Sequence, residues 1–422
     1  MHSTLQLVLI LLATAVLAVV VFRLLRLPPM LGYLLSGVII GPHALGLIPE
    51  TAETHHLAEF GVVFLMFSIG LEFSLPKLVT MKNVVFGFGT AQVCASMIIV
   101  MIVTWMTGID WRVGLALGGV LAMSSTAIVS KMLSERLELN SGHGRQIIGV
   151  LLFQDLAVVP LLILIPVLAS TIDSSNEDLV VTIALALFKA GVVLGLILFL
   201  GQRLMRPWFH LVARQKSSEL FVLNVLLITL GLAWLTGIAG LSLALGAFLA
   251  GMLISETEYR YQVEDDIKPF RDILLGLFFV TIGMLLDIQS VSDNFLWVML
   301  LLIALIGIKA LLVSALSRLF KSDSGVAMRT GLSLAQGGEF GFVLLAEANS
   351  LNIVDNATMQ PVLAAIVLSM LIAPFLIEHS ENMAQRFSAT EWMNRATQLT
   401  NIAAQTMTEE QHVILCGYGR SG

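Results

Sequence analysis

The sequence predicts an all-α membrane protein with thirteen transmembrane helices, an inverted-topology repeat and two broken helices that cross. Three observations support this fold class. The 422-residue chain is 57% hydrophobic and only 12% charged, which is far from the composition of a soluble domain. Two motifs recur at nearly one offset. Two of the apolar segments are also interrupted near their centres by polar residues and glycines.

Apolar stretches of the length that crosses hydrocarbon, roughly 17 to 25 residues, can be placed along nearly the whole chain. The expected transmembrane segments are 5–25, 30–42, 56–73, 84–107, 112–131, 146–170, 179–203, 219–236, 239–254, 270–287, 295–318, 328–349 and 358–378. Segment 5–25 has neither a basic region before it nor a small-residue cleavage site after it, so we expect a retained helix rather than a signal peptide.

The orientation follows from the basic residues, which collect on cytoplasmic loops. With the N-terminus outside, thirteen segments put the C-terminus in the cytoplasm. All of the 23 Lys and Arg residues except Arg112, Lys189 and Lys309 then fall on cytoplasmic loops or on the C-terminal tail. A wrong segment count would scramble this pattern.

An internal repeat relates the two halves of the chain. LGYLLSGVII at 31–40 matches LGAFLAGMLI at 245–254, and FSIGL at 67–71 resembles VTIGM at 280–284. Both matches pair segments that are seven apart. Because seven is odd, paired helices cross the membrane in opposite directions, an arrangement common in transporters that alternate access around a midplane site.

The repeat also pairs the two interrupted segments. One break contains Ser124, Ser125 and Thr126, and the other contains Gln336, Gly337, Gly338 and Glu339. Unwound backbone is tolerated in hydrocarbon only where it is buried in protein or lines a wet cavity, so matched breaks indicate a binding site. The alternative is a pair of small-residue patches through which helices pack.

Charged residues within apolar segments are the candidate functional groups, because each costs at least ~2.5 kcal/mol to insert. Asp155 stands beside Gln154, whose amide oxygen can ligate a cation without adding charge. Lys309 is a candidate partner of opposite sign for Asp155, and a purely structural ion pair is the alternative. Lys309 and Glu339 are also placed to neutralise the partial charges at the ends of the broken helices.

A single carboxylate predicts exchange chemistry. A proton and a monovalent cation both bind Asp155, and each disfavours the other. If the site crosses the membrane only when it is occupied, one cation exchanges for one proton without net charge movement. Oxygen ligands suit Na⁺ and K⁺ alike, so these residues leave the choice between the two ions open.

Four motifs, LLFQDLAVVPL, SSTAIV, LAQGGEFGFVLL and VEDDIKPFRDILLGLFFVTIGM, resemble the monovalent cation:proton antiporter-2 family. Within it they are similar to the Kef-type, glutathione-gated potassium efflux branch. Sodium exchangers of similar fold differ, because they usually carry Asn-Asp or Asp-Asp in place of Gln154 and Asp155. The resemblance implies a sodium/proton antiporter-like fold and a potassium:proton antiporter, a secondary active transporter rather than an enzyme.

The resemblance assigns further roles. It makes Asp155 the carrier of cation and proton, lined by Gln154, Ser125 and Thr126, and it makes residues 264–266 (Glu264, Asp265 and Asp266) an acidic regulatory loop, for which a solvated surface run is the alternative. It implies a homodimer in the bacterial inner membrane and allows for a cytoplasmic ancillary subunit. No cofactor is expected in the transmembrane domain, 1–378, and no nucleic-acid partner.

The C-terminal part turns polar. Residues 379–411 are expected to form a cytoplasmic linker, and HVILCGYGRSG at 412–422 to form a first strand running into Gly417, Gly419 and Gly422, the GxGxxG of a Rossmann-type domain. The Kef resemblance implies a truncated nucleotide-binding domain that binds NAD or AMP and senses glutathione. Without that domain we expect a transporter that leaks or is unregulated.

Three other functions remain as alternatives. A sodium:proton antiporter differs only in its cation. A gated potassium channel is disfavoured because no TVGYG-like carbonyl filter motif is present. An NAD-dependent enzyme, suggested by the terminal glycines, is disfavoured because no catalytic constellation accompanies them.

Overall fold

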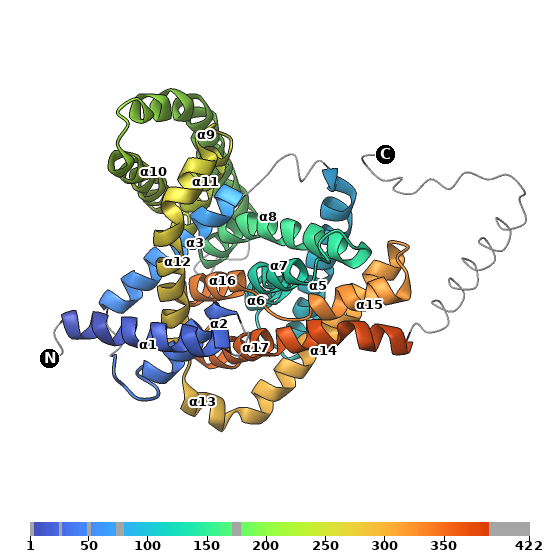
Figure 1. Ribbon diagram of the computed structural model, residues 1–422. Coiled ribbons are helices and arrows are strands. Elements are labelled where there is room, and N and C mark those ends of the chain that lie inside the picture. Colours follow the sequence, from blue (N-terminus) through green and yellow to red (C-terminus); the bar gives the residue numbers. More distant parts are fainter. Residues whose placement is uncertain (1–3, 25–27, 49–51, 73–79, 171–178, 388–422) are drawn as a thin grey trace, which may run out of the picture.

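The computed structural model describes residues 4–24, 28–48, 52–72, 80–170 and 179–387, and these form helices joined by short turns (Figure 1). The helices of the first half are α1 (Thr4–Leu24), α2 (Pro29–Ile40), α3 (Ala52–Glu72), the π-helix η1 (Asn83–Gly89), α5 (Thr90–Met106), α6 (Trp111–Ala122), α7 (Thr126–Glu135) and α8 (Gly142–Ser170). Those of the second half are α9 (Leu179–Ala213), α10 (Ser218–Ile238), α11 (Leu243–Ser255), α12 (Arg260–Met284), α13 (Ile288–Asp293), α14 (Phe295–Leu319), α15 (Ser324–Ser333), α16 (Glu339–Ser350) and α17 (Asn356–Phe387).

Every expected transmembrane segment overlaps one of these helices or a pair of them. Among the described residues, seven helices are long and apolar enough to cross a membrane, counting η1 with α5 as one and α6 with α7 as one, and five shorter apolar helices accompany them. The all-helical membrane fold is therefore confirmed, whereas thirteen as the number of crossings stays a prediction. Residues 388–422, with the expected strand and the GxGxxG motif, lie outside the described residues.

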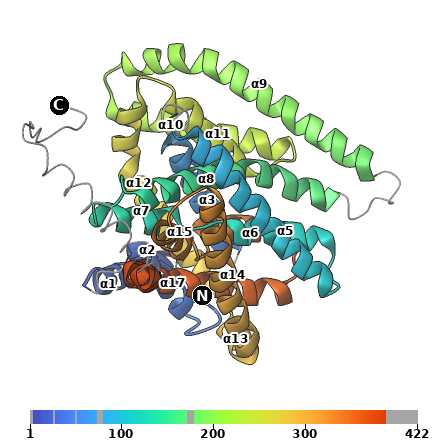
Figure 2. The ribbon, with the colours of Figure 1, turned by 90° about the vertical axis from the view of Figure 1, so that its right-hand side faces the viewer.

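The helices pack in two groups. In the first, α2 and α3 pack against α11 and α12, with α1 and α10 alongside. In the second, α6 and α16 lie near the middle of the molecule in Figure 1 and contact α5, α8 and α17. Figure 2 shows α9 as a long helix along one edge. The two breaks thus lie inside the second group.

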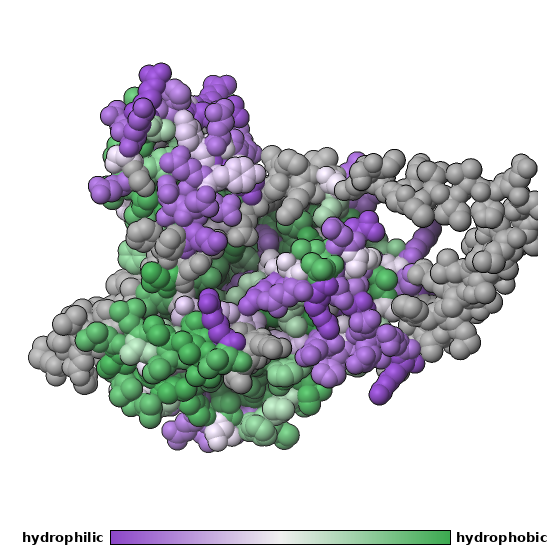
Figure 3. All heavy atoms as spheres, in the orientation of Figure 1, coloured by the Kyte–Doolittle hydropathy of each residue, from purple (hydrophilic) through white to green (hydrophobic). Residues whose placement is uncertain are grey.

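Outward-facing side chains are largely apolar, as expected where lipid replaces water. In the face shown in Figure 3, hydrophobic residues cover the region of α1 and α2, and hydrophilic residues gather at the end of the hairpin formed by α9 and α10. Single large side chains illustrate this exposure: Leu24 is 78% exposed and Leu296 is 78% exposed.

The secondary structure of the acidic residues 264–266 differs from expectation. They lie in the first turns of α12, which begins at Arg260, rather than in a loop. Val263 and Ile267, one turn apart, are 0% and 2% exposed, so a buried apolar stripe extends the helix ahead of the expected segment 270–287. Similarly, α17 continues to Phe387, past the expected boundary at 378.

Candidate ion-binding site

The two breaks meet in space. Between α6 and α7 the chain is non-helical over Met123–Ser125, and between α15 and α16 over Leu334–Gly338. The hydroxyl of Ser124 donates to the carbonyl oxygen of Leu334 at 3.0 Å. A side chain at Gly338 would overlap the main chain of Ser124, so glycine permits the close approach.

Each half-helix after a break begins with a charge or a cap. Ser125 is the N-cap of α7 and accepts from the N–H of Ile128 at 3.3 Å. Glu339 is the first residue of α16, and its Oε1 accepts from the N–H of Ala127 at 3.3 Å, so one carboxylate serves the amino ends of both α7 and α16. Glu339 is 5% exposed.

Lys309 of α14 lies at the opposite ends of the same half-helices. Its ammonium group donates to the carbonyl oxygen of Met123, which follows α6, and to that of Gln336 at 3.0 Å, which follows α15. Lys309 is 3% exposed. Because carboxyl ends of helices carry partial negative charge, the ammonium sits where that charge is greatest. The hydrogen bonds of Lys309 therefore run to the main chain and not to Asp155.

Asp155 lies on α8 beside the first residue of α7. Its Oδ1 accepts from the hydroxyl of Thr126 at 3.2 Å, and the side chain is half-buried. Thr126 and Ala127 are consecutive, so Asp155 and Glu339 contact neighbouring positions at the same amino end. A titratable, partly accessible carboxylate thus faces the crossing.

Gln154 is fully buried and turned toward the break rather than toward open space. Its Oε1 accepts from the N–H of Ser124 at 2.8 Å, and its Nε2 donates to the carbonyl oxygen of Ala122 at 3.1 Å. The amide oxygen that the sequence suggested as a cation ligand therefore holds the unwound backbone after α6.

The sequence reasoning missed Gln92 of α5. Its Oε1 accepts from Nε2 of Gln154 at 2.8 Å, and its own Nε2 donates to Ala122 at 3.1 Å and to Ser96 at 3.1 Å. Gln92 is 0% exposed. The available signal was a lone amide within the apolar segment 84–107. Ser369 of α17, which accepts from the N–H of Gly337 at 2.9 Å, was missed in the same way.

One buried amide at the crossing has no protein partner. Both polar atoms of the Gln336 side chain lack a hydrogen bond, as does Oε2 of Glu339, and Gln336 is 0% exposed. Buried polar groups are nearly always satisfied by protein or water, so these atoms point to water or an ion at the crossing. Within the described residues no cluster of three His, Cys, Asp or Glu side chains is arranged to hold a metal ion.

The site therefore brings together most of the residues expected from the sequence. Gathered at the crossing or in contact with it are Ser124, Ser125, Thr126, Gln154, Asp155, Lys309, Gln336, Gly337, Gly338 and Glu339. Residues 264–266 lie elsewhere, on α12.

A charged cluster ties the other end of α7 to α15. Arg329 donates to both carboxylate oxygens of Glu138 at 2.8 Å, and Nε2 of His143 lies 3.1 Å from Glu138. Burial raises the pKa of Glu138, but the hydrogen bonds from Arg329 and His143 outweigh it and hold that pKa below its ordinary value. The cluster joins the turn after one half-helix to the half-helix from the other break.

Comparison with known proteins identifies the family. The model of the family described as "Sodium/hydrogen exchanger, transmembrane" matches residues 9–379. The "Putative K(+) efflux antiporter KefB" of Alkalimonas amylolytica is 41% identical over 428 residues, which is 100% of this chain and 64% of that protein. The chloroplastic "K(+) efflux antiporter 1" of Arabidopsis thaliana is 42% identical over 403 residues, 93% of this chain and 33% of that protein.

The chain thus spans between one third and about two thirds of the length of these curated relatives. Among solved structures, the sodium proton antiporter MjNhaP1 from Methanocaldococcus jannaschii superposes with a TM-score of 0.65 at 17% identity, covering 89% of this chain and 96% of that one, which shows the sodium/proton antiporter fold. The resemblance to Kef-type antiporters is confirmed by the named relatives. The chain belongs to the sodium/hydrogen exchanger transmembrane family.

Proposed function

We propose that this chain is the membrane domain of a potassium:proton antiporter in which Asp155 carries K⁺ and H⁺ alternately. The observation that carries the proposal is the position of Asp155, hydrogen-bonded to Thr126 at the amino end of α7, beside the crossing of two broken helices. Membrane carboxylates in such positions mark ion and proton pathways.

The charges around Asp155 suit a site in which this one carboxylate binds either a cation or a proton. Lys309 serves the carboxyl ends and Glu339 the amino ends of the half-helices, which leaves Asp155 to balance the transported cation. One carboxylate holds either one monovalent cation or one proton. Exchange at Asp155 is therefore one for one and electroneutral, and it is secondary active transport driven by either gradient.

Potassium is favoured as the cation because two similar proteins are named K(+) efflux antiporters. A sodium:proton antiporter is the second candidate, favoured by the family description and by the sodium proton antiporter that shares the fold. We further propose a homodimer in a bacterial inner membrane, with the N-terminus outside and the C-terminus cytoplasmic. In a longer protein, a nucleotide and glutathione would act through the segment after residue 411.

The test uses the purified full chain in liposomes that contain a pH dye. We expect added K⁺ to drive proton flux that is insensitive to a clamp on membrane potential and is lost in Asp155→Asn. Asp293→Asn, which alters a carboxylate on the short helix α13, is the matched control and keeps the flux.

Each other outcome has a defined meaning. Flux that survives in Asp155→Asn would place the site elsewhere. Flux driven by Na⁺ but not by K⁺ would favour the second candidate, and K⁺ current without coupled protons would indicate a channel.

A further inference from the structure

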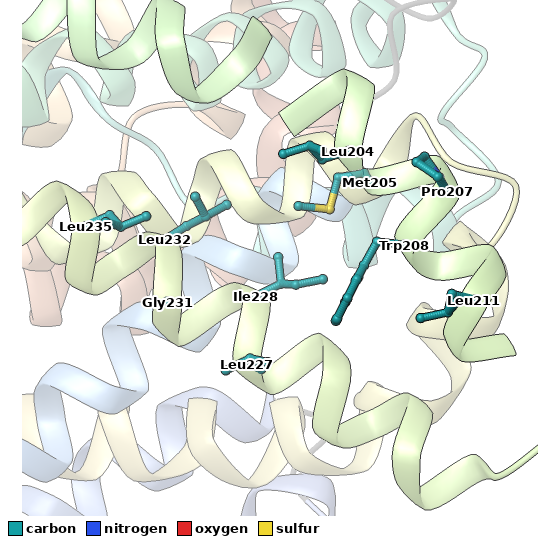
Figure 4. A pocket seen from close by; sticks show the side chains of 10 residues that line it. All are labelled: Leu204, Met205, Pro207, Trp208, Leu211, Leu227, Ile228, Gly231, Leu232 and Leu235. Carbon is teal, nitrogen blue, oxygen red and sulfur yellow. The ribbon is translucent and has the colours of Figure 1, made fainter. Parts of the chain in front are cut away.

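An apolar groove lies between α9 and α10, and none of the residues that line it belongs to the Asp155 site. Its volume is about 600 Å³, and its lining comes from residues 204–211 of α9 and 227–235 of α10. Figure 4 shows Met205 and Trp208 from α9 and Ile228 from α10 around this space. All the lining residues are apolar, so the groove suits a hydrocarbon chain.

A hydrogen bond fixes one wall of the groove. The indole N–H of Trp208 donates to Oδ1 of Asn224 on α10 at 2.6 Å, and Asn224 is only 5% exposed. The polar edge of the indole is thereby satisfied, which leaves the rest of the ring as an apolar surface. The groove is held open by a contact between the two helices that form it.

The rim of the groove is exposed. Leu204, Leu211 and Leu227 on its rim are 60%, 58% and 65% exposed. A Cβ built at Gly231, inside the groove, meets no atom within 4 Å. The described part of the chain therefore leaves room beside Gly231 for another molecule.

Positive charge stands at one end of the groove. Arg214 is the first residue after α9, three positions past Leu211, and its N–H donates to the carbonyl oxygen of His210 at 3.2 Å, so the helical turn continues through it. Arg214 and Lys216 are exposed, and no carboxylate of the described residues forms an ion pair with either of them. Hydrophilic residues gather at this end of the hairpin in Figure 3. An apolar groove that ends at two exposed cations matches an amphiphile with an anionic head.

The length of the groove fits one leaflet. The bond from Trp208 to Asn224 sets the register of the two antiparallel helices. At 1.5 Å per residue the groove then extends roughly 20 Å from Leu211 to Leu235. Half of a hydrocarbon core that is about 30 Å thick is about 15 Å, so the groove is long enough to hold one acyl chain of a leaflet while its phosphate reaches the basic end.

We propose that the groove between α9 and α10 binds an acyl chain of an anionic glycerophospholipid, whose phosphate is held by Arg214 and Lys216. This site is separate from ion exchange at Asp155, and its test does not read transport. A lipid fits better than a second copy of the chain because the groove is lined only by apolar residues and ends at Arg214 and Lys216, which no carboxylate of the described residues pairs with.

The experiment uses Trp208 as a reporter in the purified full chain, in mixed micelles. Phosphatidylglycerol with brominated acyl chains is compared with brominated phosphatidylcholine as a quencher, and the signal of Trp208→Phe is subtracted. We expect phosphatidylglycerol to quench at a lower mole fraction, by on the order of fivefold for each basic residue engaged.

Two variants separate the parts of the site. Gly231→Leu fills the groove and should abolish selective quenching, whereas Gly195→Leu, at an equally open position of α9 outside the groove, should leave it unchanged. Replacing Arg214 and Lys216 together by Gln changes only exposed side chains and should reduce quenching by phosphatidylglycerol to the level of phosphatidylcholine.

Three results would overturn the proposal. Equal quenching by both lipids in the wild type removes the selectivity for anionic head groups. Unchanged quenching in Gly231→Leu removes the groove as the site. A Gly231→Leu variant that turns from dimer to monomer by light scattering, without selective lipid quenching in the wild type, assigns the groove to a second copy of the chain.

Discussion

Gly37 of α2 and Gly251 of α11 make the same contact in the two halves of the chain. A side chain at Gly37 would overlap the carbonyl oxygen of Val280 in α12, and one at Gly251 would overlap that of Phe67 in α3. Gly37 and Gly251 are separated by 214 positions, and Phe67 and Val280 by 213, the offsets at which the sequence motifs recur. The repeat is thus a repeat of backbone contacts, in which glycine lets paired helices touch.

Replacing either glycine by alanine is expected to force these helices apart. We expect Gly37→Ala and Gly251→Ala each to destabilise the protein by about 1–3 kcal/mol, as other overpacked sites do, even though alanine favours the helix. The measurement is thermal unfolding of the purified protein in detergent.

The matched control is Gly307→Ala in α14, where an added Cβ meets nothing within 4 Å. This change should be neutral or slightly stabilising. Melting temperatures of Gly37→Ala and Gly251→Ala no lower than that of Gly307→Ala would show that the helices adjust at no cost.

Lys309→Met is expected to destabilise the crossing of the broken helices. The change removes the donor to the carbonyl oxygens of Met123 and Gln336, and a buried acceptor left without a donor costs about 1–3 kcal/mol. We expect a loss of roughly 2–5 kcal/mol in unfolding free energy together with strongly reduced cation-driven proton flux.

Lys189→Met provides the comparison, because Lys189 is the other lysine within an apolar segment and is exposed. It should leave stability and flux near wild type. If Lys309→Met were as stable and active as Lys189→Met, the ammonium group would have no role at the half-helix ends.

Gln92→Met tests whether the missed amide holds Gln154 in place. Without the acceptor on Gln92, Nε2 of Gln154 keeps only the carbonyl of Ala122 at 3.1 Å and a long contact to Ser124, so its carboxamide gains freedom to rotate. We expect the K⁺ concentration for half-maximal flux to rise several-fold with a smaller change in maximal rate. Gln202→Met, at an exposed glutamine of α9, should change neither value. An unaltered K⁺ dependence in Gln92→Met would limit Gln92 to packing.

Much of the site could be predicted because its chemistry is costly in a membrane. Charges such as Asp155 and Lys309, and breaks rich in serine and glycine, stand out within apolar segments. The pattern of apolar residues also predicted α12, apart from its first turns. There the burial of Val263 and Ile267 extends the helix through three acidic residues.

Orientation of the amides could not be read from the sequence. Gln154 was expected to offer its oxygen to a cation, and in the structure that oxygen also accepts from the backbone N–H of Ser124, which the sequence did not suggest. Gln92 of α5 and the carbonyl oxygen of Ala122 both accept from Nε2 of Gln154, and this fixes which way the carboxamide points. Residues far apart in the chain decide such choices, and a single neutral side chain gives little signal of its partner.

Glu138→Gln is expected to weaken the tie between the turn after α7 and α15 in a way that depends on pH. Because the folded-state pKa of Glu138 lies below its ordinary value, ionised Glu138 contributes stability above the unfolded-state pKa, and this contribution is lost as the pH falls through the folded value. Removing the charge should cost on the order of 1 kcal/mol at pH 7, and the gap in melting temperature from wild type should narrow as the pH is lowered below about 4.5.

Glu135→Gln is the control, since Glu135 forms only an exposed pair with Lys131 at 3.8 Å, and such pairs contribute little. If the difference in melting temperature between wild type and Glu138→Gln stayed constant from pH 7 to pH 4, Glu138 would act through packing rather than through the attraction of its charge to Arg329.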